Sequence, residues 1–184
     1  MGTRDADGGQ SGPVRESHPS APIRVLFLCT GNSARSQIAE ALLVKKGGSR
    51  FIVGSAGARP APSVHPKALA ALRQANIDWS NRHPKGFEAV QGENWDLVIT
   101  LCDRTKEACP ALPGRPVYAH WGVPDPAAVD PAGPVNPFEA TVQLLSWRID
   151  LMLALPAQQL DRAVAEERLR GIGSAYPDGP RPPA

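Results

Sequence analysis

A short polar stretch between an apolar run and a helical pattern limits the fold of this chain more than any other feature. Residues 23–28 are nearly all apolar and predict a buried strand, and residues 37–43 have the composition and apolar spacing of a helix. The stretch between them is Cys29-Thr30-Gly31-Asn32-Ser33-Ala34-Arg35-Ser36. A cysteine therefore ends the predicted strand, and an arginine begins the predicted helix after a tight loop.

The spacing of Cys29 and Arg35 has a chemical meaning, since five residues separate them. A tight loop at the start of a helix turns backbone N–H groups toward one point, where they and the helix dipole can bind a tetrahedral oxyanion. Arg35 can add two parallel hydrogen bonds to such an anion. We expect the oxyanion to be bound by the residues of this loop, Thr30, Gly31, Asn32, Ser33, Ala34 and Arg35.

The same loop favours a reactive thiol at Cys29. A cysteine beside a helix start and a cation loses its proton easily, and the hydroxyl of Ser36 can donate a hydrogen bond to the resulting thiolate. The loop therefore predicts a nucleophilic thiolate at Cys29, with Arg35 and Ser36 as further catalytic residues. The alternative is that Cys29 is a buried, inert cysteine at the end of a strand.

Three further apolar runs and two further helical patterns complete the predicted fold. The runs at residues 51–53, 97–101 and 117–119 predict strands, and a loop is expected over residues 55–62. Pro66 begins a predicted helix that ends near residue 75. A later helix has apolar residues at spacings of three and four, namely Phe138, Val142, Leu145, Ile149 and Met152. This order predicts a single α/β domain of three layers, with a four-stranded parallel sheet and helices on both faces.

Composition divides the chain into three parts. Residues 1–22 are rich in Gly, Ser, Pro and charged residues, and we expect a disordered tail there. Residues 23–155 form the predicted folded domain. Residues 156–184 form a C-terminal extension, in which a helical pattern over 163–169 is followed by a Pro- and Gly-rich end that we also expect to be disordered.

Net charge and cysteine usage bound the partners and the location of the protein. The 184 residues carry a net charge of +2, so nothing favours a nucleic acid or an anionic membrane as a partner. No apolar run has the length of a membrane span, and the N-terminus lacks the apolar segment of a secretory signal. The three cysteines form no obvious disulfide framework, which favours a reducing cytoplasm.

Cys102 and Cys109 form a second chemical signal. Cys102 follows a predicted strand, so a parallel topology brings it to the same sheet edge as Cys29. Cys109 comes seven residues later, without the paired ligands of a zinc site. A helix of that length spans about 10 Å, more than the roughly 7 Å that a disulfide allows between Cα atoms. A disulfide here would require partial unwinding; the alternative is two unrelated core cysteines.

Asp125 lies in the loop that follows the last predicted strand. A carboxyl group at this edge of the sheet can act as general acid toward a leaving oxygen. The alternative is an ordinary Asp-Pro turn, which is the commoner meaning of that dipeptide. His65, His83 and His120 share no metal-ligand spacing, so we interpret them as structural or exposed residues and predict no metal site.

The loop from Cys29 to Ser36 resembles the signature loop of low-molecular-weight protein tyrosine phosphatases, and it resembles still more that of the arsenate reductases built on the same fold. The features that fit the thioredoxin-coupled branch of these reductases are residues 55–57, residues 64–66, the pair Cys102 and Cys109, and residues 120–127. The resemblance covers about residues 23–155, with the motifs in the expected order. It implies the fold of the low-molecular-weight tyrosine phosphatases.

The resemblance also implies reduction of arsenate to arsenite by a relay of three cysteines, for arsenic detoxification. Cys29 would attack bound arsenate and form a thiol–arsenate adduct, while Asp125 protonates the departing oxygen. Cys102 would then attack Cys29 and release arsenite, and Cys109 would move the disulfide to Cys102–Cys109. An external thiol protein, with thioredoxin favoured, would reduce that disulfide, so no bound cofactor is expected.

Two positions depart from the pattern of the family. Phosphatases of this fold usually carry a tyrosine after the Asp-Pro, where this chain has Ala127, and this weakens the phosphatase interpretation. Some of the reductases bind a monovalent cation behind the loop, and Asn32, Glu40 and Ser55 match three of its ligands. Lys85 lies near the fourth position, so we predict no bound potassium ion.

Two other functions remain open. A phosphatase for phosphotyrosine or aryl phosphates would need Cys29, Arg35 and Asp125 alone, and weak phosphatase activity could also accompany a reductase. A non-enzymatic sensor of redox state or of oxyanions is the second alternative. The pair of Cys102 and Cys109 favours the reductase, because phosphatase chemistry does not require it.

Overall fold

The structure is a computed structural model that describes residues 21–107, 109, 111–129, 133–156 and 162–175. The predicted N-terminal tail therefore lies outside the described residues, except for Ala21 and Pro22, which are exposed. The predicted disordered end of the chain, from residue 176 onward, lies outside them as well.

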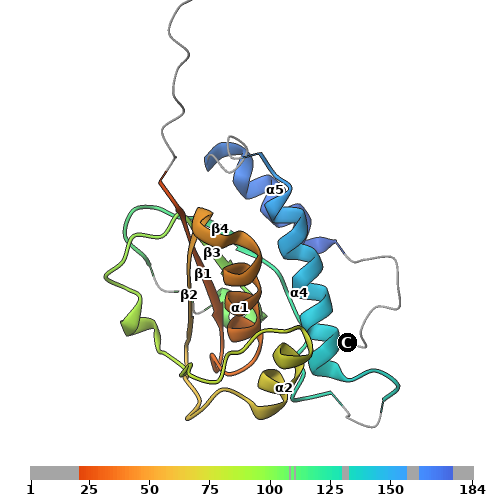
Figure 1. The fold of residues 1–184 in the computed structure, drawn as a ribbon. Coiled ribbons are helices and arrows are strands. Elements are labelled where there is room, and N and C mark those ends of the chain that lie inside the picture. The colour runs from red at the N-terminus through yellow and green to blue at the C-terminus, as the bar shows by residue number, and fades with distance from the viewer. Residues whose placement is uncertain (1–20, 108, 110, 130–132, 157–161, 176–184) are drawn as a thin grey trace, which may run out of the picture.

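Four parallel strands form the sheet at the centre of the molecule (Figure 1). They are β1 (Ile23–Cys29), β2 (Phe51–Gly57), β3 (Leu97–Thr100) and β4 (Val117–His120), in the order β2-β1-β3-β4. β1 has a neighbour on each side and helps to form both core clusters, so its residues 25–28 are wholly buried. A strand buried on both faces needs the continuous apolar run that the sequence supplies there. The predicted parallel sheet is confirmed.

The predicted length of β2 was wrong. The apolar run predicted a strand over residues 51–53 and a loop from Ser55, but the strand continues to Gly57. It does so because it pairs with β1 along its whole length, which ends with Cys29 opposite Gly57. The end of β2 therefore lies beside the loop that follows Cys29. β3, in contrast, ends at Thr100, one residue earlier than predicted.

The long helices cover one face of the sheet (Figure 1). They are α1 (Arg35–Gly47), α4 (Pro137–Leu153) and α5 (Arg162–Ser174), and their apolar side chains form the larger core cluster with the sheet. α2 (Pro66–Gln74) packs against α4. Both α2 and α4 have proline as their first residue and a side-chain cap just before it. The His65 side chain accepts a hydrogen bond from the backbone N–H of Lys67, and the Asn136 side chain accepts one from the backbone N–H of Phe138.

The opposite face of the sheet is covered by the one-turn helix η2 (Phe87–Ala89) and by loops. The smaller core cluster on this face contains Leu26, Leu28, Ala56, Val90, Trp95, Val98 and Leu112. The short helix α3 (Asp103–Glu107) follows β3, and η1 (Gly48–Arg50) connects α1 to β2. Helical turns thus lie on both faces as predicted, but the three long helices share one face.

α5 contributes to the same core as the sheet. Its Ala165, Leu169 and Ile172 are buried in the larger cluster, and Nε1 of Trp121 donates a hydrogen bond to the carbonyl of Leu169 at 2.8 Å. We therefore propose that the folded domain extends through α5 instead of ending at residue 155. Among the described helices, none has the length and apolar character that crossing a membrane requires.

Candidate active site

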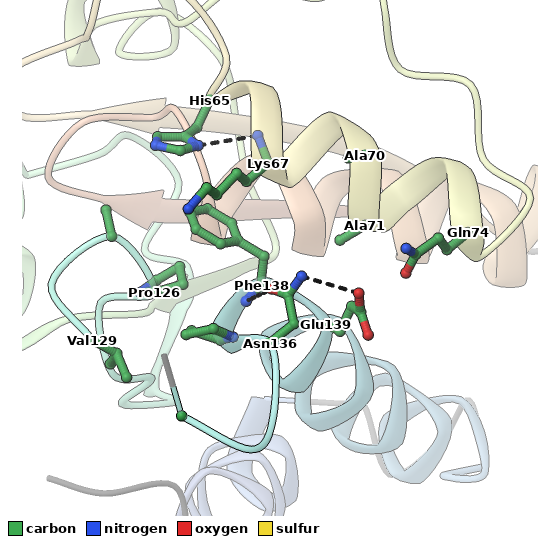
Figure 2. A pocket seen from close by; sticks show the side chains of 13 residues that line it. His65, Lys67, Ala70, Ala71, Gln74, Pro126, Val129, Asn136, Phe138 and Glu139 are labelled. Atoms are coloured by element: carbon green, nitrogen blue, oxygen red, sulfur yellow. Dashed lines mark hydrogen bonds between the residues drawn. The ribbon is translucent and has the colours of Figure 1, made fainter. Parts of the chain in front are cut away.

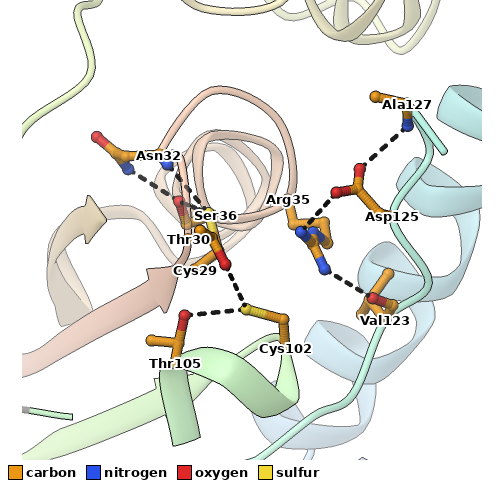
Figure 3. A network of polar contacts seen from close by, with 10 residues as sticks. All are labelled: Cys29, Thr30, Asn32, Arg35, Ser36, Cys102, Thr105, Val123, Asp125 and Ala127. Carbon is orange, nitrogen blue, oxygen red and sulfur yellow. Dashed lines mark hydrogen bonds and ion pairs between the residues drawn. The ribbon is translucent and has the colours of Figure 1, made fainter. Parts of the chain in front are cut away.

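The loop between β1 and α1 surrounds the sulfur of Cys29 with hydrogen-bond donors (Figure 3). The backbone N–H of Asn32 donates to Sγ of Cys29 at 3.2 Å, and Oγ of Ser36 lies 3.0 Å from the same sulfur. Asn32 has a φ of 47°, a left-handed conformation that asparagine adopts more readily than most residues. Cys29 is buried, with 2% of its surface exposed.

A buried polar network behind the loop holds Asn32 in place. Its Nδ2 donates to Oγ of Ser36 and to Oγ of Ser55, both at 2.8 Å. Ser55 donates to Oε2 of Glu40 at 2.5 Å, and the backbone N–H of Lys85 donates to Oδ1 of Asn32 at 2.7 Å. Burial raises the pKa of Glu40, although the hydrogen bond from Ser55 and nearby cationic side chains act in the opposite direction. The three residues that match the cation site of the family therefore lie together, and Lys85 adjoins them.

Arg35 links the loop to the segment that follows β4 (Figure 3). Its buried guanidinium donates to the carbonyl of Val123 at 3.2 Å and to Oδ2 of Asp125 at 3.0 Å. The Asp125 side chain is 47% exposed, and its Oδ1 accepts the N–H of Ala127 at 3.1 Å. Asp125 thus does form a turn, and it also lies beside the arginine of the loop, where a proton donor to a bound oxyanion is needed.

Cys102 faces the same loop from the end of β3 (Figure 3). Its Sγ lies 3.3 Å from Oγ1 of Thr30 and 2.9 Å from Oγ1 of Thr105. Burial of the sulfur works against the thiolate, but the hydrogen bonds from Thr105 and Thr30 and the charge of Arg35 outweigh it and lower the pKa of Cys102. The sheet therefore brings the second cysteine against the residue that follows the first.

Cys109 lies in a different environment. It packs against the smaller core cluster, on the face of the sheet opposite the long helices, and burial raises its pKa to about 11. α3 covers residues 103–107 of the segment between the two cysteines. Cys29, Cys102 and Cys109 are all free thiols.

Of the three histidines considered above, His65 and His120 make contacts of a structural kind. His65 caps α2 and its ring stacks on Phe138 with ring centroids 4.6 Å apart, whereas His83 is exposed. His120 has Nδ1 2.8 Å from Oγ1 of Thr100 and Nε2 3.1 Å from Oδ1 of Asp103. Among the described residues, no group of three or more His, Cys, Asp or Glu side chains is arranged to hold a metal ion.

Thr105 was not singled out in the sequence, and Gly57 was noted only as part of the run at residues 55–57 that fits the family. Thr105 contacts the sulfur of Cys102, and the only signal for it was a hydroxyl three residues after that cysteine. A Cβ on Gly57 would lie 2.7 Å from the backbone N of Asn32, so the loop packs directly against this glycine. The short run Ser-Ala-Gly was the available signal for Gly57, and it was interpreted as loop.

A cavity of about 480 Å³ adjoins the Asp125 segment (Figure 2). It lies between the length of α2 and the start of α4, and its lining includes His65, Gln74, Ala127 and Phe138. Cys29, Arg35 and Asp125 are absent from that lining. The cavity is therefore a neighbour of the loop between β1 and α1 and not the loop itself.

Comparison with known proteins places this geometry in a family. The family model for "Low molecular weight phosphotyrosine protein phosphatase" matches residues 24–166. The chain belongs to this family. The match includes every residue of the loop, Asp125 and both later cysteines, and it ends within α5.

Relatives within the low-molecular-weight phosphatase family include proteins named for a different activity. An arsenate reductase of Bacillus cereus (strain 03BB102) is 42% identical over 103 residues, which are 56% of this chain and 76% of the relative. The structure of a Corynebacterium glutamicum thioredoxin-dependent arsenate reductase has a TM-score of 0.54 and 31% identity, covering 73% of this chain and 62% of that one. An arsenate reductase in its phosphate-binding state has a TM-score of 0.59 and 26% identity, covering 72% of this chain and 97% of that one.

Proposed function

We propose that this protein is an arsenate reductase that works through three cysteine thiols. The observation that carries the proposal is the position of Cys102, whose sulfur lies 3.3 Å from the hydroxyl of Thr30, the neighbour of Cys29. Phosphatase chemistry needs no second thiol at the oxyanion loop, whereas reduction of a bound oxyanion needs one as electron donor. The arsenate reductases among the relatives support the same conclusion.

The first step is attack by Cys29 on bound arsenate. The N–H groups of the loop and the guanidinium of Arg35 bind the oxyanion. The thiolate of Cys29 displaces one arsenate oxygen and forms a sulfur–arsenic bond, while Asp125 donates a proton so that this oxygen leaves as water. Arg35 and Asp125 pair in the free protein; when the anion binds to Arg35, the carboxylate of Asp125 is released and takes up, from the bound hydrogen arsenate or from solvent, the proton that it then donates.

Cys102 carries out the second step by attacking Sγ of Cys29. The sulfur–arsenic bond breaks with its electron pair remaining on arsenic, which becomes trivalent and leaves as arsenite, and a Cys29–Cys102 disulfide forms. The lowered pKa of Cys102 supports this order of attack, because the thiolate is the reactive species.

Cys109 completes the relay by attacking Cys102. This exchange returns Cys29 as a thiol and leaves a Cys102–Cys109 disulfide for an external dithiol protein, with thioredoxin favoured, to reduce. Because the pKa of Cys109 is raised to about 11, we expect this thiol to stay protonated until the α3 segment rearranges. The electrons come from thiols, so no bound cofactor takes part, and a reducing cytoplasm is the location we propose.

A phosphatase is the second candidate, because the family model carries that description and because Cys29, Arg35 and Asp125 would suffice for it. Ala127 provides no aromatic ring after Pro126 to stack on an aryl phosphate, which favours the reductase. Weak hydrolysis of small phosphate esters is compatible with either function, since phosphate and arsenate are alike in shape and charge. A redox or oxyanion sensor without catalysis is the remaining alternative.

A single-turnover experiment tests the proposal. Fully reduced protein is mixed with excess arsenate in the absence of external thiol, and arsenite and remaining free thiols are measured. We expect one arsenite per chain with the loss of two thiols, and peptide mass mapping should locate the bond at Cys102–Cys109. The Cys102→Ser variant should release no arsenite under these conditions.

Three other outcomes would contradict the proposal. Arsenite formation that requires glutathione or another small thiol would refute the internal relay of three cysteines but would still support arsenate reductase activity. Absence of arsenite under both conditions, together with hydrolysis of an aryl phosphate, would identify a phosphatase. Absence of both activities would favour the sensor.

A further inference from the structure

Thr105 is a buried polar residue on the short helix α3. Its exposed fraction is 0%, whereas Asp103, Arg104 and Lys106 of α3 are all exposed. Its Oγ1 lies 2.9 Å from the sulfur of Cys102, whereas Oγ1 of Thr30 lies 3.3 Å from the same sulfur (Figure 3). We propose that Thr105 is a positioning residue that stabilises the thiolate of Cys102 for its attack on Cys29.

The backbone of α3 fixes the direction of this contact. The carbonyl of Cys102 accepts hydrogen bonds from the N–H groups of Thr105 and Lys106, both at 3.1 Å. The first turn of the helix therefore starts at Cys102, and the side chain of Thr105, three residues later, points back toward the sulfur of Cys102. A threonine at this position has little rotamer freedom, so its hydroxyl is held ready to donate.

The turn is also attached to the ends of two strands. Oδ1 of Asp103 lies 3.1 Å from Nε2 of His120 at the end of β4, and Nδ1 of His120 lies 2.8 Å from the hydroxyl of Thr100 at the end of β3. Burial, Lys106 and Arg148 together lower the pKa of His120 despite the charge of Asp103, so the ring is neutral at neutral pH and these contacts are hydrogen bonds. α3 is thereby held in the position that aims Thr105 at Cys102.

The hydroxyl of Thr105 distinguishes between the two protonation states of Cys102. Donation of a hydrogen bond stabilises the thiolate more than the thiol, which increases the fraction of Cys102 that is ready to react at neutral pH. The charged and titratable groups around this turn are Arg35 from α1, Asp103 and Lys106 from α3, His120 from β4, and Arg148 from α4, which acts on His120. None of them is altered by a substitution at Thr105, so a change in the pH profile reports on the hydroxyl.

This inference rests on the proposed function, but its test needs no arsenate. The reduced full-length protein is treated with iodoacetamide over a range of pH, and the extent of labelling at each cysteine is read by peptide mass mapping. Thr105→Val keeps the shape of the side chain and removes the donor, whereas Thr105→Ser keeps the donor. The matched control is Thr141→Val, because Thr141 is a buried threonine whose hydroxyl bonds the carbonyl of Pro137 and no thiol.

We expect Thr105→Val to move the labelling midpoint of Cys102 to higher pH and to slow its labelling at neutral pH by about three- to tenfold. The loss of rate is smaller than the loss of thiolate, because the thiolate of a less acidic thiol is a better nucleophile. For the same reason the variant should react faster than the wild type at high pH, where Cys102 is a thiolate in both proteins. Thr105→Ser and Thr141→Val should leave the profile of Cys102 unchanged, and Cys29 should be unaffected in all variants.

A profile for Cys102 in Thr105→Val that coincides with the wild type would overturn the inference. If Thr105→Val fails to fold, Thr105→Ala serves in its place, and the same coincidence would count against the proposal. In single turnover, arsenite release by Thr105→Val should be slowed near neutral pH and recover as pH rises. Wild-type protein that releases no arsenite would refute the reductase, whatever the labelling profile shows, so the two failures are distinct.

Discussion

Asn32 shows how much of the site depends on one side chain. Its backbone N–H donates to Cys29, its amide nitrogen donates to Ser36 and Ser55, and its amide oxygen accepts from the backbone of Lys85. One left-handed residue thus connects the nucleophile to the network that ends at Glu40. Because this network is buried and its members are paired, the loss of any one partner would leave another unsatisfied.

The charge state of Glu40 gives a prediction at the residue scale. Its pKa is raised from an ordinary value of 4.5, chiefly by burial. At pH values between 4.5 and the pKa of Glu40 in the folded state, the folded protein binds more protons than the unfolded chain. The contribution of Glu40 to stability therefore falls as pH rises from 4.5 through the folded pKa. Glu40→Gln removes the ionisation and keeps an acceptor for the hydroxyl of Ser55.

We therefore expect the free energy of unfolding of Glu40→Gln, relative to the wild type, to increase between acidic and neutral pH. Urea denaturation of both proteins across that range measures the difference. A difference that is the same at every pH, or that falls as pH rises, would show that the cationic side chains of Arg82 and Lys85 and the hydrogen bond of Ser55 dominate over burial.

At the scale of elements, β2 supports the loop between β1 and α1 through Gly57. A Cβ at this position would lie 2.7 Å from the backbone N of Asn32 and 2.8 Å from the carbonyl of Thr30, and backbone atoms cannot move aside as the end of a side chain can. We expect Gly57→Ala to lower the free energy of unfolding by about 1–3 kcal/mol and to abolish most arsenite release, because the loop must shift.

The control for this prediction is Gly92→Ala, since nothing lies within 4 Å of a Cβ at that glycine. Urea denaturation and single-turnover arsenite release should both be close to the wild type for Gly92→Ala. Equal behaviour of the two variants would mean that β2 does not determine the shape of the loop.

At the scale of the whole molecule, α5 is attached to the strand that leads to Asp125. A Cβ on Gly173 would lie 2.1 Å from the carbonyl oxygen of His120 and 2.7 Å from Cδ1 of Trp121, whereas nothing lies within 4 Å of a Cβ on Gly171 of the same helix. The close approach of α5 to the end of β4 therefore requires glycine at one of these two positions and not at the other.

The two glycines make a matched pair for testing this attachment. We expect Gly173→Ala to destabilise the protein by about 1–3 kcal/mol through overpacking. Gly171→Ala should stabilise it by about 0.5–1 kcal/mol, because alanine favours a helix more than glycine does. Urea unfolding of both variants measures the contrast, and indistinguishable effects would argue against packing of α5 on β4.

The sequence by itself predicted the parallel sheet and the composition of the oxyanion loop. Both follow from short-range patterns: the apolar runs define the strands, and Cys29 and Arg35 are separated by so few residues that the loop closes on itself. The placement of Cys102 at the same edge also followed, because the carboxyl ends of parallel strands meet there whatever the details of packing.

Only the tertiary structure decided the contacts that span long separations. The pairing of β1 extended β2 to Gly57, Arg35 met Asp125 across 90 residues, and α5 joined the core beyond the predicted limit of the domain. The turn that carries Thr105 was held against two strand ends through His120, which contacts both Asp103 and Thr100. Such contacts depend on which surfaces pack together, and packing is the sum of many small interactions that no local pattern of residues contains.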